Sequence, residues 1–221
     1  MATSNESANA KVFIGMPVYN GARFLTEAIE SIRSQSFTEW HLFISDDCST
    51  DDSGEIARRY AALDPRITYH PQAKNLGMFA NMKYSLDHAD LSYFLLAAQD
   101  DIRESNFLKT TVEFLEENSE YGFATTRMIA IDSLGRELIK ETTLTRYEGS
   151  PSALKIAKYV LEPEILGKCN LMYGLFRTEI AKALWQLYPL RKVWGPDYHF
   201  SLALVGHFSI HIDPAYLFRK R

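Results

Sequence analysis

The sequence is poor in cysteine. Its 221 residues include only Cys48 and Cys169, which are too few for a disulfide framework and match no zinc-binding spacing. This composition fits a reducing compartment, so we expect a cytoplasmic protein.

Long apolar runs are also absent. The longest uninterrupted one is YFLLAA, residues 93–98, whereas a helix needs about 20 apolar residues to span a bilayer. Residues 1–10 are polar and lack the apolar core of a signal peptide, and we expect them to form a disordered tail. Peripheral association with the inner face of the membrane remains open.

Positive charge is not in excess. The chain has 24 Lys and Arg against 28 Asp and Glu, a net charge of -4. Nucleic-acid-binding surfaces normally carry a basic patch, so we expect no nucleic-acid partner. With 46% hydrophobic residues the chain can build one sizeable core, and we predict a single domain over residues 11–221.

Apolar runs and helical periodicities alternate through the first half of the chain. Residues 11–19 (KVFIGMPVY) are almost continuously apolar, which is typical of a parallel strand buried on both faces. Strands are predicted at residues 11–19, 40–45, 66–70, 92–98 and 122–132, and helices at residues 22–35, within 49–63, 75–89 and 106–118. This alternation predicts an α/β fold with a mostly parallel sheet flanked by helices.

The second half of the chain has a mixed pattern. We predict a turn at residues 133–137 and a short strand up to residue 140. A loop is expected at residues 142–152, a strand at residues 170–177 and an extended segment at residues 208–218. Helices are expected at residues 152–162, 178–188 and 196–206.

Two of the predicted strands end in paired carboxylates. Asp46 and Asp47 follow WHLFIS, and Asp100 and Asp101 follow YFLLAAQ. Ligands of open parallel sheets bind beyond the carboxyl ends of the strands, so both pairs and residues 17–20 should line one cleft. Capping of the next helix is an alternative for Asp46 and Asp47, but no helix starts directly after Asp101.

Carboxylates that gather in one cleft repel one another unless a cation offsets their charge. Mg²⁺ and Mn²⁺ prefer carboxylate oxygen, and Mg²⁺ is usually held by one or two carboxylates together with substrate phosphates. The paired acids therefore indicate a site for a nucleoside diphosphate with Mn²⁺ or Mg²⁺. One Asp could instead accept a hydrogen bond from a base or a ribose hydroxyl.

Residues 16–53 resemble the opening of the family 2 glycosyltransferases, which have the GT-A fold. That family begins with a strand ending P-x-Y/F-N, a helix ending S-x-x-x-Q-T/S-F/Y and a second strand ending D-D-x-S-x-D. The matching residues are Pro17, Tyr19, Asn20, Ser31, Gln35, Ser36, Phe37, Asp46, Asp47, Ser49 and Asp51. The resemblance continues through roughly residues 11–210, more weakly toward the end.

The resemblance implies an inverting enzyme that moves a sugar from a nucleotide-sugar, most often UDP-linked, to a saccharide, lipid-linked or other hydroxyl acceptor. It also implies a role in surface polysaccharide synthesis, with a nucleotide-binding half at residues 1–130 and an acceptor-binding half at residues 131–221. The implied site comprises the nucleotide-binding residues Pro17, Tyr19, Asn20, Asp47, Asn75, Asn81 and Asp100, the metal ligand Asp101 and the general base Asp197.

Three positions depart from the family pattern. The acidic motif often reads D-x-D-D, but its first position here is Ala98, and Pro196 precedes Asp197 where an acid is common. Arg221 stands where many members have the His of a C-terminal R-x-H, and an Arg binds phosphate but cannot ligate a cation. Asp197 itself could be a first-turn acid that the helix dipole favours.

Two other functions remain open. Ala98 and Arg221 would suit a non-catalytic nucleotide-sugar-binding or assembly module of the same fold. A nucleotide-sugar pyrophosphorylase would need a Gly-rich basic loop after the first strand, where this chain has one Gly and one Arg.

Trp185 and Trp194 are candidate platforms for an acceptor sugar, although mid-helix Trp185 is expected to pack in the core.

Overall fold

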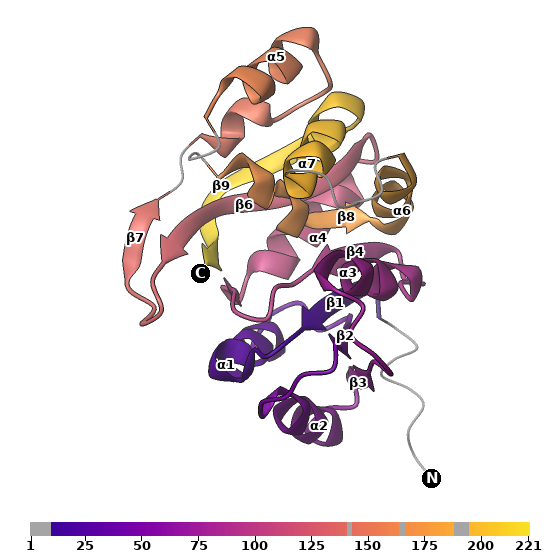
Figure 1. The fold of residues 1–221 in the computed structure, drawn as a ribbon. Coiled ribbons are helices and arrows are strands. Elements are labelled where there is room, and N and C mark those ends of the chain that lie inside the picture. Colours follow the sequence, from indigo (N-terminus) through magenta and orange to yellow (C-terminus); the bar gives the residue numbers. More distant parts are fainter. Residues whose placement is uncertain (1–9, 141–142, 164–166, 188–194) are drawn as a thin grey trace.

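A computed structural model describes residues 10–140, 143–163, 167–187 and 195–221 (Figure 1). The predicted tail, apart from residue 10, and Trp194 lie outside these ranges.

The strands are β1 (Val12–Val18), β2 (Trp40–Asp46), β3 (Ile67–Pro71), β4 (Tyr93–Leu96), β5 (Ile102–Arg103), β6 (Tyr121–Ile131), β7 (Glu137–Lys140), β8 (Leu175–Arg177) and β9 (Ser209–Lys220). The helices are α1 (Ala22–Arg33), α2 (Ser53–Leu63), α3 (Met78–Asp87), α4 (Phe107–Glu117), η2 (Leu144–Tyr147), α5 (Ala153–Leu161), η4 (Lys168–Tyr173), α6 (Thr178–Leu187) and α7 (Pro196–His207).

One sheet runs through both halves of the described chain, in the order β3-β2-β1-β4-β8-β6-β9-β5, with β7 paired to β6. The four strands from β3 to β4 are parallel. Ile14 in β1 faces Leu42 on one neighbour and Leu95 on the other, and all three side chains are fully buried. Burial on both faces explains the nearly continuous apolar runs and confirms the predicted α/β fold.

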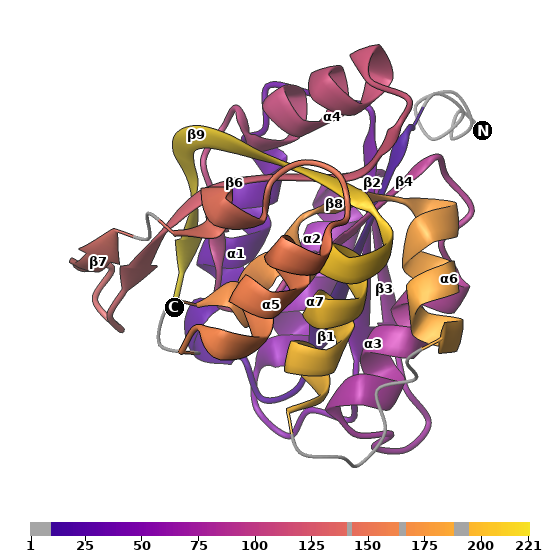
Figure 2. The ribbon, with the colours of Figure 1, turned by 90° about the horizontal axis from the view of Figure 1, so that it is seen from above.

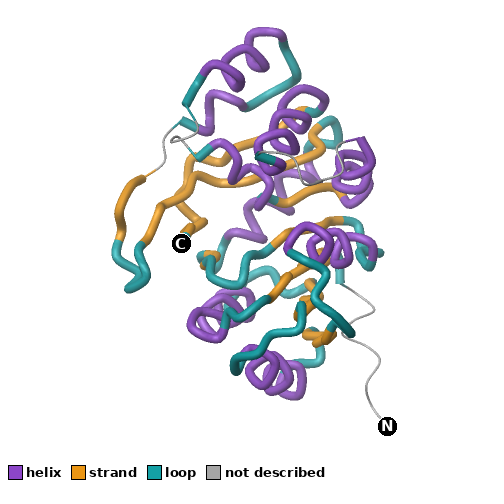
Figure 3. The backbone as a smooth tube through the Cα atoms, in the orientation of Figure 1, coloured by secondary structure: helices purple, strands orange, loops and turns teal. Residues whose placement is uncertain are grey.

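The remaining strands have mixed directions, as the second half of the sequence indicates. β8 is antiparallel to β4 and β6, whereas β9 is parallel to β6. β7 pairs with the end of β6 and stands at the outer edge of the ribbon (Figures 1 and 2). The carboxyl end of the chain lies between the two halves (Figure 3), where Arg221 Nη2 donates a 2.8 Å hydrogen bond to Glu27 of α1.

The strand predicted at residues 170–177 is wrong in its first part, which forms η4, and only β8 is extended. The apolar residues Leu171 and Met172 are buried in this 3₁₀ turn. Lys168 at its start is also buried, and its ammonium donates to the carbonyls of Tyr159 and Glu162 at the end of α5. An apolar run alone does not distinguish a buried strand from a buried turn.

Two further elements differ from the sequence predictions. The short strand β5 follows the second acid pair directly and pairs with Phe218 and Arg219 of β9. The described part of the predicted loop at residues 142–152 contains η2. The extended segment expected at residues 208–218 is confirmed as β9.

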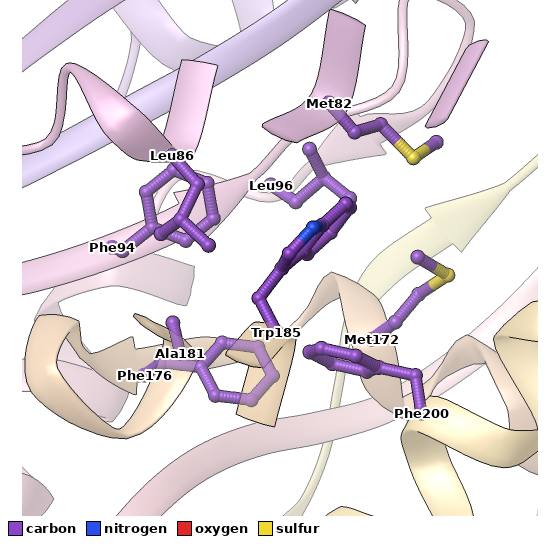
Figure 4. Close-up of a pocket in the computed structure, with 9 residues that line it drawn as sticks. All are labelled: Met82, Leu86, Phe94, Leu96, Met172, Phe176, Ala181, Trp185 and Phe200. Atoms are coloured by element: carbon purple, nitrogen blue, oxygen red, sulfur yellow. The ribbon is translucent and has the colours of Figure 1, made fainter. Parts of the chain in front are cut away.

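Trp185 belongs to the apolar core, as expected. Trp185 and eight other apolar side chains from α3, β4, η4, β8, α6 and α7 line a cavity of only about 10 Å³ (Figure 4). The indole lies 6.0 Å from the Phe200 ring, at 62° to it, and Trp185 is 7% exposed. Trp185 therefore stabilises the contact between the two halves and is not available to an acceptor. Within the described ranges, no helix has the length and apolar character needed to cross a membrane.

Candidate active site

A cleft of about 560 Å³ opens at the carboxyl ends of β1, β2 and β4. The order of the sheet changes direction here, because β2 and β3 lie on one side of β1 and β4 lies on the other. Such switch points are where open α/β sheets bind ligands, and the volume is typical of a small-molecule site. Among the described residues, the cleft is lined by Pro17, Val18, Tyr19, Asp47, Asn75, Gly77, Met78, Asn81, Met82, Leu96, Ala97, Ala98, Gln99, Asp100, Tyr173 and Lys220.

Gln99 holds the end of β1 at the mouth of this cleft. Its Oε1 accepts a 2.9 Å hydrogen bond from the backbone N–H of Tyr19, and its Nε2 donates to the Tyr19 carbonyl at 3.2 Å. A Cβ at Gly21 would come within 2.3 Å of Gln99 Oε1, so a side chain there would displace this amide. The clamp leaves the Tyr19 side chain 50% exposed. Its ring is thus available to a ligand.

Asn20 does not line the cleft but joins the two loops beside it. Its backbone is left-handed, with φ of 49°. Its Oδ1 accepts a 2.8 Å hydrogen bond from Thr50 N, and its own N–H donates to Ser49 Oγ at 3.0 Å. Asn20 therefore fixes the loop after β1 against the loop after β2.

Asp47 lines the cleft, although its carboxylate is already bound to backbone amides. Oδ1 accepts a 2.6 Å hydrogen bond from Leu76 N, and Oδ2 accepts one of 2.9 Å from Gly77 N. Gly77 has φ of 84°, a conformation that favours glycine, and leads into α3. Asp47 is 2% exposed. Its observed contacts shape the wall of the cleft at residues 75–77.

Asp46 points away from the cleft. Its Oδ1 accepts from Ser49 N, and its Oδ2 accepts a 2.8 Å hydrogen bond from the Tyr69 hydroxyl. Burial and this carboxylate raise the pKa of Tyr69 to about 12. Asp46 therefore holds the loop after β2 and does not cap α2, which begins at Ser53.

Two asparagines complete this wall. Asn75 Nδ2 donates to the Asp47 carbonyl at 3.0 Å. Asn81 is 1% exposed, and its amide both accepts from Ser45 Oγ at 2.6 Å and donates to the Ser45 carbonyl at 2.8 Å. Both amides frame the cleft by tying α3 and its entry loop to β2.

The second acid pair divides between two environments. Asp100 lines the cleft, and its backbone carbonyl accepts a 2.9 Å hydrogen bond from Arg221 Nη1. The Asp101 side chain is 1% exposed and does not line the cleft. Its Oδ1 accepts from Lys220 Nζ at 3.1 Å and from Arg221 N at 3.0 Å.

Burial raises the pKa of Asp101, and the nearby positive charges of Lys220 and Arg103 oppose that shift. Asp101 Oδ2 is buried and has no hydrogen-bond partner in the described part of the chain. A divalent cation at Oδ1 would displace the ammonium of Lys220, whereas Oδ2 has no donor to displace among the described residues. In this arrangement Asp101 does not line the cleft. No group of three or more His, Cys, Asp or Glu residues suited to a metal occurs within the described ranges.

Tyr173 lies near three of the four acids that were predicted for the site. It lines the cleft, and its pKa is raised chiefly by burial and then by the negative charges of Asp101, Asp100 and Asp197. Asp197 lies in the first turn of α7 and is not itself a lining residue; its Oδ1 accepts from Tyr198 N at 3.0 Å. All three carboxylates are thus within electrostatic reach of one phenol at the cleft.

The sequence analysis assigned no role to three lining residues, Gln99, Tyr173 and Lys220. Gln99 occupies a position of the acidic motif, so its place in the motif was a usable signal. Lys220 lies 119 residues from its partner Asp101. No local pattern connects residues so far apart, and none distinguishes Tyr173 from other apolar residues of its segment.

The fold and the cleft define a GT-A-type α/β protein with a ligand site at the carboxyl edge of its parallel strands. Residues 13–181 match the model of the family described as Glycosyl transferase family 2, and the chain belongs to that family of glycosyltransferases.

Relatives with names support this assignment. "Putative glycosyltransferase EpsE" of Bacillus subtilis (strain 168) is 36% identical over 130 residues, which cover 58% of this chain and 47% of the relative. "Putative teichuronic acid biosynthesis glycosyltransferase TuaG" of the same strain is 27% identical over 163 residues, 73% of this chain and 61% of the relative. The chain thus spans about half to three fifths of the length of these two relatives.

Solved structures share the fold at low sequence identity. S. aureus TarS residues 1–349 in complex with UDP has a TM-score of 0.70 and 20% identity, covering 95% of this chain and 60% of that one. Mannosyltransferase PcManGT from Pyrobaculum calidifontis, in complex with GDP-Man and Mn²⁺, has a TM-score of 0.65 and 16% identity, covering 95% and 56%. These likenesses establish the architecture.

Proposed function

We propose that this chain is the catalytic part of an inverting glycosyltransferase that moves a sugar from a UDP-sugar to a hydroxyl acceptor. The acceptor would be a saccharide or a lipid-linked hydroxyl in the synthesis of a surface polysaccharide, and the reaction would take place in the cytoplasm. The name of TuaG refers to teichuronic acid biosynthesis, and TarS has been solved with UDP and with UDP-GlcNAc. Those names motivate the donor and the acceptor class.

The observation that carries this proposal is the cleft at the switch point of the sheet, with acids from different strand ends around it. Tyr19 would offer its exposed ring to the uracil, beside the backbone wall that Asp47 holds. Asp100 would accept hydrogen bonds from the ribose hydroxyls. Pro17, Asn75 and Asn81 would shape the walls, and Asn20 would hold the adjoining loops.

The chemical step needs a base on the acceptor side of the cleft. Asp197 would take the proton from the acceptor hydroxyl as that oxygen attacks the anomeric carbon from the face opposite the diphosphate. The bond between the anomeric carbon and the diphosphate oxygen breaks, and UDP leaves with the electron pair. This displacement inverts the anomeric configuration. Positioning and charge stabilisation would supply most of the rate.

A binding module without catalysis is the second candidate. The buried, lysine-bound carboxylate of Asp101 favours it, because a family member without the usual acidic metal site could bind a nucleotide-sugar and not turn it over. This candidate predicts tight nucleotide binding together with no release of UDP.

A test of turnover separates the two candidates. Release of the matching nucleoside diphosphate from a panel of UDP-, GDP- and dTDP-sugars is measured for the whole chain with mixed oligosaccharide and lipid-linked acceptors. Asp197→Asn should lower kcat by about 10² to 10⁴ and leave the affinity for UDP unchanged. The exposed Asp90→Asn is the matched control and should behave like the wild type. Turnover that survives Asp197→Asn would rule out the assigned base, and nucleotide binding without any turnover would favour the binding module.

A further inference from the structure

We propose that Lys220, in place of a divalent metal ion, supplies the positive charge that holds the donor diphosphate in this cleft. The inference rests on the proposed function, since it concerns the same donor site. The chain would then bind and use its donor without a metal ion.

Lys220 is the only basic side chain among the described residues that line the cleft. Its Nζ lies 3.1 Å from Asp101 Oδ1 and 5.2 Å from the centre of the Tyr173 ring. The ammonium also donates to the Arg221 carbonyl at 3.2 Å, and the side chain remains 22% exposed and lines the cleft. An ammonium has three donors, and a cleft-facing one can bind a phosphate oxygen.

Other cations near the cleft are already engaged. Arg221 binds the Asp100 carbonyl and the carboxylate of Glu27. Arg103 is 2% exposed and donates to the Tyr173 carbonyl. Neither lines the cleft, which leaves Lys220 as the cation positioned for an anionic ligand.

The backbone holds Lys220 in a fixed place. β9 pairs with β6 so that Lys220 stands opposite Ala130, and the preceding residue, Arg219, pairs with Ile102 of β5. Because Ile102 directly follows Asp101, the same pairing brings Lys220 to that carboxylate. A cation held by strand pairing needs little reorganisation when the donor binds.

The surroundings of Asp101 suit an ammonium better than a metal ion. Oδ1 already has two donors, Lys220 Nζ and Arg221 N, and Asp101 does not line the cleft where the diphosphate would lie. A divalent ion brought to this carboxylate would stand next to the Lys220 charge and be repelled by it. Asp101 therefore orients Lys220, and Asp100 remains open to the ribose.

During sugar transfer, negative charge grows on the diphosphate as the bond to the anomeric carbon breaks. The Lys220 ammonium would stabilise that charge by a charge-assisted hydrogen bond, without giving up its proton. No further reactant is needed, because the electron pair leaves with UDP and the acceptor proton goes to Asp197.

The test is calorimetry of UDP and of uridine binding to the whole chain, in EDTA and then in Mn²⁺. The wild type should bind UDP in EDTA within about threefold of its affinity in Mn²⁺. Lys220→Met should weaken UDP binding in EDTA by about 10-fold or more, the usual effect of removing a charged hydrogen-bond partner, and should leave uridine binding unchanged. The exposed Lys109→Met is the matched control and should bind like the wild type.

Wild-type UDP binding that vanishes in EDTA and returns with Mn²⁺ would overturn the inference while leaving the proposed function intact. Unchanged UDP binding by folded Lys220→Met would also overturn it. If Lys220→Met does not fold, Lys220→Arg keeps the charge and should retain UDP binding in EDTA; a loss there counts against the inference. A wild type that binds no nucleoside diphosphate in either condition would overturn both proposals.

Discussion

Asp47→Ala tests whether the cleft wall depends on one buried carboxylate. The carboxylate of Asp47 accepts the backbone N–H groups of Leu76 and Gly77, at 2.6 Å and 2.9 Å, and is 2% exposed. After the change, Leu76 N loses its partner, whereas Gly77 N keeps a 3.1 Å hydrogen bond to Asn75 Oδ1. Hydrogen bonds to charged groups are worth about 1.5–3 kcal/mol each, and the retained bond offsets part of that loss.

We therefore expect Asp47→Ala to lower the free energy of unfolding by about 2–4 kcal/mol. In a domain of this size, that change lowers Tm by about 4–16 °C. Because residues 75–77 form one wall of the cleft, the affinity for UDP should fall in the same variant.

Thermal unfolding followed by circular dichroism measures the first effect, and calorimetry with UDP measures the second. The matched control is Asp52→Ala, which removes an exposed acid that caps no backbone amide and should change stability by less than about 0.5 kcal/mol. An Asp47→Ala variant with wild-type Tm and weaker UDP binding would refute this reasoning, because Asp47 would then act on the base directly.

Two further changes test the clamp at the cleft and a buried lysine. Gln99→Ala removes both hydrogen bonds to the Tyr19 backbone and should weaken UDP binding about 10-fold, whereas the exposed Gln186→Ala should leave calorimetric titrations unchanged. Burial lowers the pKa of Lys155 to about 8, below its value of 10.5 in the unfolded chain. Holding the buried side chain charged therefore lowers the free energy of unfolding below pH 8. This destabilisation disappears as the pH rises from 8 toward 10.5. Lys155→Met should therefore raise the free energy of unfolding by about 1–2 kcal/mol at pH 7 and by a smaller amount at pH 10. A Tm at pH 7 below that of the wild type would contradict this expectation.

The amino-terminal half of the sheet could be predicted from the sequence because its chemistry is local. A strand buried on both faces must be apolar along its length, as residues 12–18 are, and the chain must become polar where that strand meets the cleft. This pattern predicts Pro17, Tyr19 and Asp100 at the same edge of the sheet, and all three line the cleft there.

The roles of neighbouring acids could not be separated in the same way. Adjacent residues point in different directions, so Asp100 lines the cleft while Asp101 binds Lys220 and Arg221 at the end of β9. Likewise, Asp46 and Asp47 bind different groups. Which neighbour faces the ligand depends on strand pairing with a segment far along the chain, and sequence spacing does not contain that information.

The segment at residues 170–177 shows a second limit. Its apolar residues are buried as a strand's would be, but Lys168 ties the start of the segment to the end of α5 and the chain curls into η4. Tyr173, the last residue of this turn, lines the cleft. The conformation of this part of the site therefore depends on tertiary contacts and cannot be predicted from local sequence preferences.

A crystal structure of the chain grown with UDP tests the proposed donor site most directly. The base should lie beside Tyr19 and the wall at residues 75–77, the ribose near Asp100 and the diphosphate within hydrogen-bond distance of Lys220. UDP bound at another surface, or with its phosphates turned away from β4 and β9, would contradict the donor site described for this chain.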